Sequence, residues 1–157
     1  MPNMTMDTAK ELATSQLFEG LEAEDIAVFA NIAQEARYEP QQEVFAPGSA
    51  GDALYVIVEG AFAVRMKNDD GEDVDVAQLK EGTYFGEMEV IGGMNRAASI
   101  VSVGDGRCYR FDASELLNML KTKHHLAAHF YREVARELIK RLRTTTRDMG
   151  YFKSRAG

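Results

Sequence analysis

The first part of the chain carries apolar residues at the spacing of one face of an α-helix. Over residues 6–36 these positions are Leu17, Phe18, Leu21, Ile26, Phe29 and Ile32. Gly20 interrupts the pattern, and Glu22, Glu24 and Asp25 follow it. Acidic residues stabilise the positive N-terminal end of a helix, so a new helix is expected to begin there. The pattern therefore predicts a helical segment over residues 6–36 with a break near Gly20.

From Tyr38 onwards the pattern changes to short runs of β-prone residues. They lie at residues 43–45, 54–58, 62–64, 74–76, 99–103 and 107–111. Turn residues such as Pro47-Gly48 and Asp70-Gly71 separate the runs. An Asp-Gly pair between two alternating runs is a strong hairpin signal. Turns at intervals of about ten residues predict an antiparallel sandwich or barrel over residues 38–112.

After Ala113 the chain returns to a helical pattern. Asp112 or Ser114 is placed to cap a short helix over residues 115–120, and a long helix is expected from His124 to Tyr151. Residues spaced 4, 3, 4 and 3 apart form a short coiled-coil seam on it, at Leu138, Leu142, Thr145, Met149 and Phe152. A helix with an apolar stripe needs a surface to pack on. We therefore expect a parallel homodimer through residues 130–152.

The composition is that of one folded domain. The chain has 157 residues, of which 45% are hydrophobic and 27% charged, enough for one sizeable core. No apolar run approaches the roughly 20 residues that span a bilayer. The single cysteine, Cys108, excludes an internal disulfide and fits a reducing compartment. We expect one domain, residues 1–157, that is cytoplasmic and has no membrane segment.

Charge is distributed unevenly along the chain. The net charge is -7, which argues against a surface that binds nucleic acid as a whole. Residues 132–155 contain eight basic and three acidic residues, a net charge of +5, so the remainder carries -12. This stretch is either a solvated helix face or a docking surface for an acidic partner, such as an unknown effector protein.

Residues 85–100, between two predicted strands, combine the residue types that bind a phosphorylated ribose. Gly86 lets the backbone approach a ligand closely, and residues 88–91 can form one helical turn whose free N–H groups face an anion. Arg96 is a planar cation suited to a phosphate, and Glu87 can accept a hydrogen bond from a hydroxyl. Each feature alone is common. Together they fit a ribose that carries a single phosphate.

Two motifs occur in order along the chain. The first runs from Pro47 to Gly60 and reads Pro-Gly-Ser-Ala-Gly-Asp-Ala-Leu-Tyr-Val-Ile-Val-Glu-Gly. The second is Phe85-Gly86-Glu87 followed by Arg96-Ala97-Ala98-Ser99. They resemble a strand pair and the phosphate-binding cassette, respectively, of the cyclic-nucleotide-binding domain family, which includes catabolite activator proteins and kinase regulatory subunits. The cassette here covers residues 85–99, and the resemblance extends from about residue 12 to residue 152.

The resemblance implies both a fold and a function. The fold is α+β: an antiparallel β-roll over residues 38–112, similar to a jelly-roll barrel, with N-terminal helices before it and C-terminal helices over residues 113–152. The function is reversible binding of a cyclic nucleotide, without catalysis or a cofactor, that switches the C-terminal helix. No DNA-binding domain is expected in this chain. The alternative is a degenerate family member that acts as a dimeric interaction module and binds no nucleotide.

The resemblance also implies roles for residues of the cassette. Arg96 would pair with the phosphate, and Glu87 would accept a hydrogen bond from the ribose 2′-hydroxyl. Backbone N–H groups would hold the ligand as well, so the implied ligand-binding residues are Phe85, Gly86, Glu87, Met88, Glu89, Arg96, Ala97 and Ala98. Glu89 departs from the family pattern, which has Ala or Gly there. A carboxylate that faces the phosphate would repel it and weaken binding.

The resemblance implies four further residues next to the nucleobase. Val64 and Val76 would line the base pocket, although they are equally suited to an ordinary barrel core. Thr145 and Thr146 would hydrogen-bond adenine, although Thr145 also suits a polar position in the seam. A threonine directly after the cassette arginine favours cGMP in this family. Ala97 at that position therefore favours cAMP, with cGMP as the second candidate.

Metal and nucleophile chemistry have weaker support. His125 and His129 lie four residues apart and could share a metal ion, but no carboxylate or thiol is nearby in sequence. A cupin-type metal enzyme needs histidines on barrel strands, and the three histidines lie on none of the predicted strands. Cys108 lies on an alternating strand and is most simply a core residue. We therefore expect neither a metal site nor a catalytic residue.

Overall fold

The computed structural model describes residues 4–156, and the side chains of residues 6–147. Helices and strands up to the cassette are α1 (Met4–Leu12), the 3₁₀ helix η1 (Gln16–Phe18), α2 (Ala23–Ala30), β1 (Ala33–Tyr38), β2 (Glu43–Phe45), β3 (Ala53–Glu59), β4 (Phe62–Lys67), β5 (Asp73–Leu79) and β6 (Tyr84–Phe85). They are followed by α3 (Glu87–Gly92), β7 (Ser99–Ser102), β8 (Gly106–Asp112), α4 (Ala113–Thr122) and α5 (His124–Ala156).

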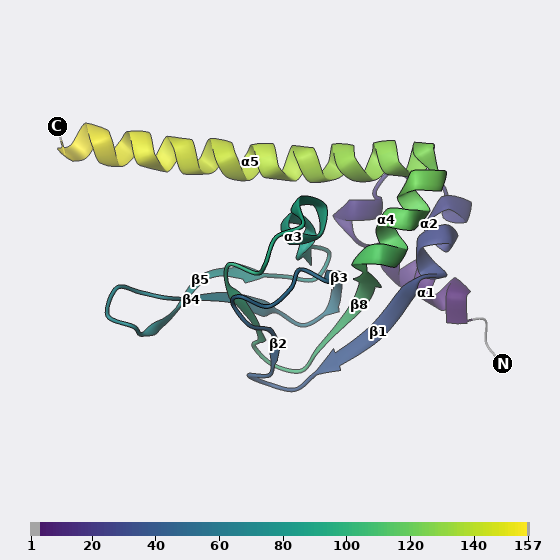
Figure 1. The fold of residues 1–157 in the computed structure, drawn as a ribbon, viewed down its shortest axis with the longest axis horizontal. Coiled ribbons are helices and arrows are strands. Elements are labelled where there is room, and N and C mark those ends of the chain that lie inside the picture. Colours follow the sequence, from purple (N-terminus) through teal and green to yellow (C-terminus); the bar gives the residue numbers. More distant parts are fainter. Residues whose placement is uncertain (1–3, 157) are drawn as a thin grey trace.

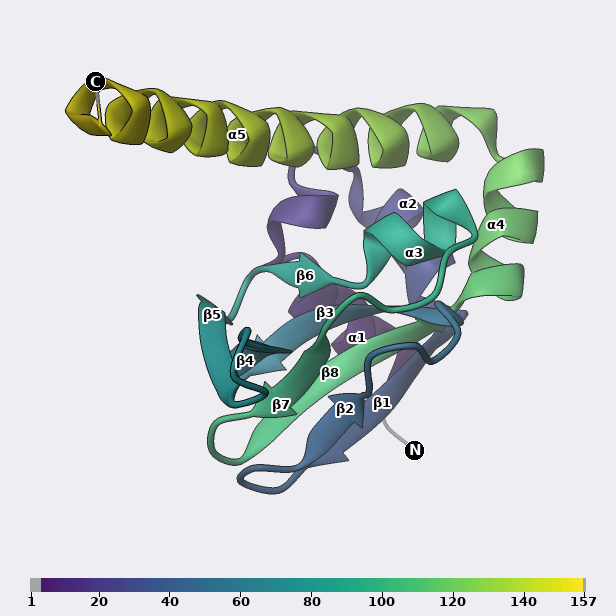
Figure 2. The same cartoon turned by 60° about the vertical axis from the view of Figure 1, so that its left-hand side comes forward.

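The strands form two antiparallel sheets of four, in the orders β1-β8-β3-β6 and β2-β7-β4-β5 (Figures 1 and 2). Strand β3 is buried on both faces, because its alternating side chains enter two different cores. Leu54 and Val56 pack against the helices, while Tyr55 and Ile57 belong to a second core with strand residues such as Phe62 and Phe85. The predicted antiparallel β-roll with flanking helices is confirmed.

Residues 33–38 form a strand and not the end of a helix. Helix α2 ends at Ala30, and β1 pairs with β8 from Ala33 opposite Phe111 to Tyr38 opposite Gly106. The prediction of a helical segment over residues 6–36 is therefore wrong for its last residues, and η1 interrupts it further. Backbone hydrogen bonds to a strand far along the chain decide the conformation here, and helical spacing that ends at Ile32 cannot reveal them.

Helix α5 runs along one side of the roll (Figures 1 and 2). Its first half is anchored in the core by three buried residues, Leu126, Phe130 and Val134. Leu138 packs partly against the same core, whereas Ile139 and Leu142 are exposed. The side chains of Met149 and Phe152, the last two predicted seam positions, lie outside the described residues. No helix in the described part of the chain is both long and apolar enough to cross a bilayer.

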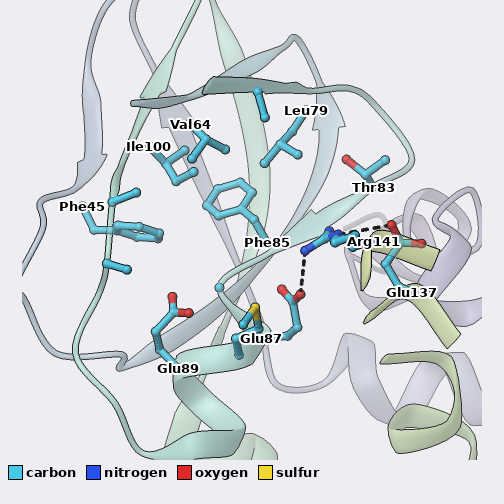
Figure 3. A pocket seen from close by; sticks show the side chains of 15 residues that line it. Phe45, Val64, Leu79, Thr83, Phe85, Glu87, Glu89, Ile100, Glu137 and Arg141 are labelled. Carbon is cyan, nitrogen blue, oxygen red and sulfur yellow. Dashed lines mark hydrogen bonds and ion pairs between the residues drawn. The ribbon is translucent and has the colours of Figure 1, made fainter. Parts of the chain in front are cut away.

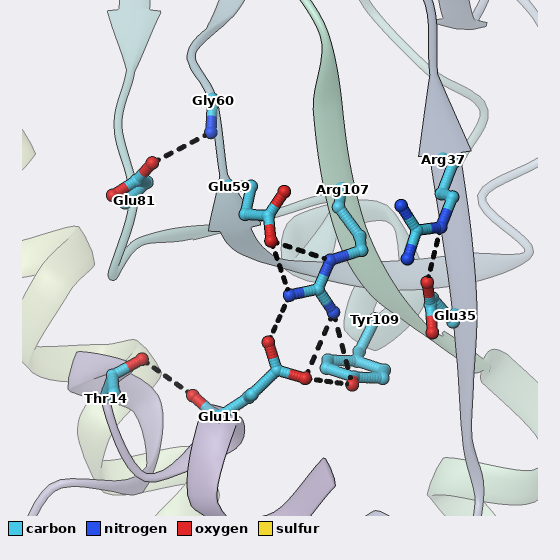
Figure 4. Close-up of polar contacts among 9 residues, drawn as sticks. All are labelled: Glu11, Thr14, Glu35, Arg37, Glu59, Gly60, Glu81, Arg107 and Tyr109. Carbon is cyan, nitrogen blue, oxygen red and sulfur yellow. Dashed lines mark hydrogen bonds and ion pairs between the residues drawn. The ribbon is translucent and has the colours of Figure 1, made fainter. Parts of the chain in front are cut away.

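A polar cluster joins α1 to the roll (Figure 4). Arg107 on β8 donates hydrogen bonds to the carboxylates of Glu11 and Glu59, with an Nη1–Oε1 distance of 3.1 Å to Glu11 and an Nη2–Oε1 distance of 2.8 Å to Glu59. The Tyr109 hydroxyl donates to Glu11 at 2.6 Å. The Arg107 hydrogen bond lowers the pKa of the Glu11 carboxyl. The ionised form of Glu11 therefore helps to hold α1 on the sheet.

Candidate functional site

A cavity of about 440 Å³ opens among the second sheet, α3 and α5 (Figure 3). Its apolar lining comes mainly from strand residues: Phe45, Val64, Ala77, Leu79, Phe85 and Ile100. Its polar and charged lining comes from Thr83, Glu87, Glu89, Glu137 and Arg141. An apolar hollow of this size with a few converging polar groups is typical of a small-ligand site.

Gly86 determines how closely α3 approaches the sheet. Its φ is +89°, in the left-handed region. A Cβ at this position would lie 2.9 Å from the Ala53 carbonyl oxygen and 2.9 Å from Arg96 Nη1. Both the backbone conformation and the close packing therefore require glycine. The helical turn predicted over residues 88–91 corresponds to α3.

Glu87 is a buried carboxylate on the wall of the cavity. It is only 2% exposed, and its Oε1 accepts a hydrogen bond from Arg141 Nη1 of α5 at 3.4 Å (Figure 3). Burial raises the pKa of Glu87, and Arg141 partly opposes this shift. Arg141 also donates from Nε to Glu137, four residues earlier, at 3.3 Å. Helix α5 thus places a charged pair at the cavity, directly against the cassette.

Arg96 is buried beside the cavity and does not line it. Its side chain is fully buried, and its Nη1 donates to Glu89 Oε1 at 2.8 Å and to the Gly86 carbonyl at 3.0 Å. Its Nη2 donates to the Ala53 carbonyl at 2.5 Å, and the Phe45 ring centroid lies 4.0 Å from the guanidinium carbon. Glu89 does line the cavity. The cavity therefore meets a carboxylate where the resemblance implies an arginine that pairs with the phosphate.

The structure brings most of the predicted ligand-binding residues together. The predicted residues that line the cavity are Val64, Phe85, Gly86, Glu87, Met88, Glu89, Ala97 and Ala98. The cassette contributes most of them because it is a single local segment. Their contacts with a ligand stay a prediction.

Val76 is outside the cavity, which contradicts its predicted place. Its side chain is 55% exposed. The register of β4 against β5 shifts here: Val64 lies opposite Ala77, and Arg65 lies opposite Asp75. Val76 is thus the extra residue of a β-bulge, which re-aims the side chains of the bulged strand. Ala77 lines the cavity in its place.

Thr145 and Thr146 also lie outside the cavity lining. Both are exposed, and the Thr145 hydroxyl donates to the Arg141 carbonyl at 3.0 Å. The cavity instead receives Glu137 and Arg141 from α5. Sequence reasoning missed both of these residues. Their spacing of four residues indicates an acid–base pair on a helix, but it does not tell which side of the helix faces the roll.

The histidines and the cysteine serve packing and local hydrogen bonding. His125 lies 3.1 Å from the Asp25 carboxylate, and His129 lies 3.0 Å from the Leu17 carbonyl oxygen. Among the described side chains, no group of three or more His, Cys, Asp or Glu could hold a metal ion. Cys108 is buried as predicted, and burial raises its pKa to about 12. Its thiol is therefore protonated at neutral pH and is a poor nucleophile.

Comparison with known proteins decides the family. The model of the cyclic nucleotide-binding domain family matches residues 35–123, which is more than half of the chain. The chain belongs to this family. It is 40% identical over 67 residues to the cAMP-dependent protein kinase type II regulatory subunit of Drosophila melanogaster, a match that covers 43% of the chain and 18% of that protein.

A second curated relative and a solved structure agree with this assignment to the cyclic nucleotide-binding domain family. The chain is 34% identical over 92 residues to a cAMP-dependent protein kinase regulatory subunit of Mucor circinelloides f. lusitanicus, covering 59% of the chain and 21% of that protein. The chain thus spans about a fifth of the length of these curated relatives. The Thermus thermophilus catabolite activator protein superposes with a TM-score of 0.78 at 25% identity, covering 88% of this chain and 63% of that one.

Proposed function

We propose that this cyclic nucleotide-binding domain is a non-catalytic, cytoplasmic receptor module whose ligand is cAMP, with cGMP as the second candidate. The single observation that carries the proposal is the buried carboxylate of Glu87 on the cavity wall. A buried carboxylate needs hydrogen-bond donors, and a ribose hydroxyl would supply one. The apolar lining on the opposite side would take the purine base. Ala97, in place of a threonine, supports cAMP over cGMP.

The proposal includes a switch in α5. Arg141 of α5 is bonded to Glu87, the same carboxylate that a ribose would engage. A bound ligand would therefore compete with Arg141, or bridge to it, and so change how α5 sits on the roll. Thr145 lies one helical turn beyond Arg141. It meets a base only if α5 shifts along its axis or if a second copy of the chain supplies the residue.

Dimerisation through α5 is part of the same proposal. Ile139 is 55% exposed and Leu142 is 66% exposed, on a helix that otherwise carries many charges. Leu138 of the predicted seam is partly used by the chain's own core. The surface offered to a second copy therefore begins with Ile139 and Leu142.

One observation favours the second candidate, an interaction module that binds no nucleotide. Arg96, which the phosphate needs, is already paired with Glu89 and is closed off from solvent. If this pair stays closed, the cassette is a structural element whose charges neutralise each other, and the chain has no receptor function. Direct binding measurements separate the two candidates.

Isothermal titration with cAMP tests the receptor function. We expect the wild-type protein to bind, and Glu87→Ala to bind about 10–100-fold more weakly because a hydrogen bond to a charged group is lost. Glu39→Ala is the control, since Glu39 is exposed in the turn after β1 and outside the cavity. Absence of binding by the wild type at millimolar cAMP, or equal affinity of Glu87→Ala and Glu39→Ala for cAMP, would contradict the proposal.

A further inference from the structure

The carboxylate of Glu89 occupies the anion position of the cassette arginine. Glu89 Oε1 lies 2.8 Å from Arg96 Nη1, and the two side chains are 17% and 0% exposed. The other carboxylate near the guanidinium, that of Asp52, is 4.0 Å away and 64% exposed. A carboxylate and a phosphate oxygen make the same kind of charge-assisted bond with a guanidinium. The chain's own Glu89 carboxylate therefore takes the place at Arg96 that a ligand phosphate would otherwise occupy.

The Arg96 guanidinium is also bonded to the backbone. Nη1 donates to the Gly86 carbonyl and Nη2 to the Ala53 carbonyl, whereas Nε is buried and has no hydrogen-bond partner among the described residues. The stem of Glu89 is held by close packing against Gly51, where an added Cβ would lie 2.4 Å from the Glu89 Cβ. The pair is thus a packed part of the cassette. A phosphate can take the Nη1 donor of Arg96 only by displacing the Glu89 carboxylate.

The charges around the cavity also disfavour a ligand phosphate. Three carboxylates line the cavity, those of Glu87, Glu89 and Glu137, together with the single guanidinium of Arg141. With Arg96 behind Glu89, three negative groups face two positive ones. A cyclic phosphate would add another negative charge to this surplus, whereas an uncharged ribonucleoside would leave the Glu89–Arg96 pair intact.

We propose that Glu89 is the specificity-determining residue of the site: it competes with a ligand phosphate for Arg96. The site consequently draws its affinity from base and ribose and discriminates weakly between cAMP and the uncharged nucleoside adenosine. This inference rests on the proposed receptor function, since it concerns the same cavity. It changes the chemical class of ligand that the cavity accepts, from cyclic nucleotides alone to ribonucleosides as well.

Isothermal titration of cAMP and of adenosine against the wild type, Glu89→Ala and Glu89→Gln tests this inference. We expect wild-type affinities for the two ligands within about tenfold of each other. Glu89→Ala should bind cAMP at least tenfold more tightly and adenosine with less than a threefold change, because only the phosphate competes with Glu89. Glu89→Gln keeps a hydrogen-bond acceptor for Arg96 without the charge, so it should show the same direction even if the alanine variant folds poorly. Glu43→Gln, an exposed carboxylate on β2, is the control.

The outcomes separate this inference from the function on which it rests. Tighter cAMP binding by the Glu89 variants, with adenosine unchanged, supports it. If the wild type binds cAMP and removal of the Glu89 charge leaves that affinity equal or weaker, the competition does not exist and the receptor function stands. If the wild type and both variants bind neither ligand, the receptor function itself is wrong, and the inference is wrong with it.

Discussion

Gly86 is the residue on which the geometry of the site depends most directly. It takes a left-handed backbone conformation and touches both Ala53 and Arg96. Gly93, at the other end of α3, also has a positive φ of 65°, but no other atom lies within 4 Å of where its Cβ would be. The two glycines therefore separate the cost of the backbone conformation from the cost of a steric clash.

We expect Gly93→Ala to lower the free energy of unfolding by about 1–2 kcal/mol, the cost of a left-handed alanine. Gly86→Ala should cost about 3 kcal/mol, because overpacking adds to the backbone strain. Gly86→Ala should also weaken cAMP binding, since α3 and Arg96 would have to move apart. Urea unfolding of both variants measures the difference. Equal costs would show that the close approach at Gly86 is not rigid.

Helix α1 is tied to the roll by ionic contacts between separate elements. Arg107 on β8 holds Glu11 of α1 and Glu59 of β3, and the Arg107 hydrogen bond lowers the pKa of Glu11. A carboxyl whose pKa is depressed by folding contributes stability above its ordinary pKa of 4.5, and this contribution disappears as pH falls. The attachment of α1 should therefore be sensitive to acid.

Glu11→Gln should destabilise the protein at pH 7 by about 1–2 kcal/mol, in line with loss of a partly exposed charged hydrogen bond. The gap in melting temperature between wild type and Glu11→Gln should be constant above about pH 5 and shrink as pH falls below it, through the lowered pKa of Glu11. Glu35→Gln removes an exposed ion pair with Arg37 and should change little at any pH. A gap for Glu11→Gln that stays constant with pH would contradict the role given to its ionised form.

The elements that the sequence predicts well are those specified by neighbouring residues. The cassette forms one local segment, so both of its ends, residues 85–89 and 97–98, lie at the cavity, and Asp112 caps α4 through the Glu115 N–H. Elements specified by distant partners were missed or misplaced. Strand β1 depends on β8, the bulge at Val76 depends on β4, and the side of α5 that faces the roll depends on packing of Leu126, Phe130 and Val134.

The pairing of Glu89 with Arg96 shows the same limit at the site. The sequence indicates that Glu89 departs from the family pattern and would repel a phosphate. It does not indicate that the carboxylate turns onto Arg96, because the six residues between them include the end of α3 and the turn that follows it. Only the three-dimensional path of the cassette brings the two groups to 2.8 Å.

At the scale of the whole molecule, the exposed part of α5 predicts a dimer. Light scattering should give a mass near 35 kDa, twice the 17.5 kDa of the chain. Leu142→Lys should shift the mass to that of the monomer, because a charge would be buried in the interface. Thr144→Lys adds the same charge on the opposite side of α5 and should remain dimeric. A wild-type mass of 17.5 kDa at all concentrations would contradict dimerisation through this helix.

The central claim is that the cavity of this cyclic nucleotide-binding domain receives a cyclic nucleotide. Thermal unfolding with cAMP, cGMP and AMP tests it most directly. At a hundred times its dissociation constant a ligand adds about 2.7 kcal/mol, which raises the melting temperature of a domain of this size by about 5–10 °C. We expect that shift with cAMP and a smaller one with cGMP. AMP should give none, because its phosphate monoester brings about two negative charges next to Glu89. No shift with any of them at millimolar concentration would contradict the claim and leave the interaction module as the function of this chain.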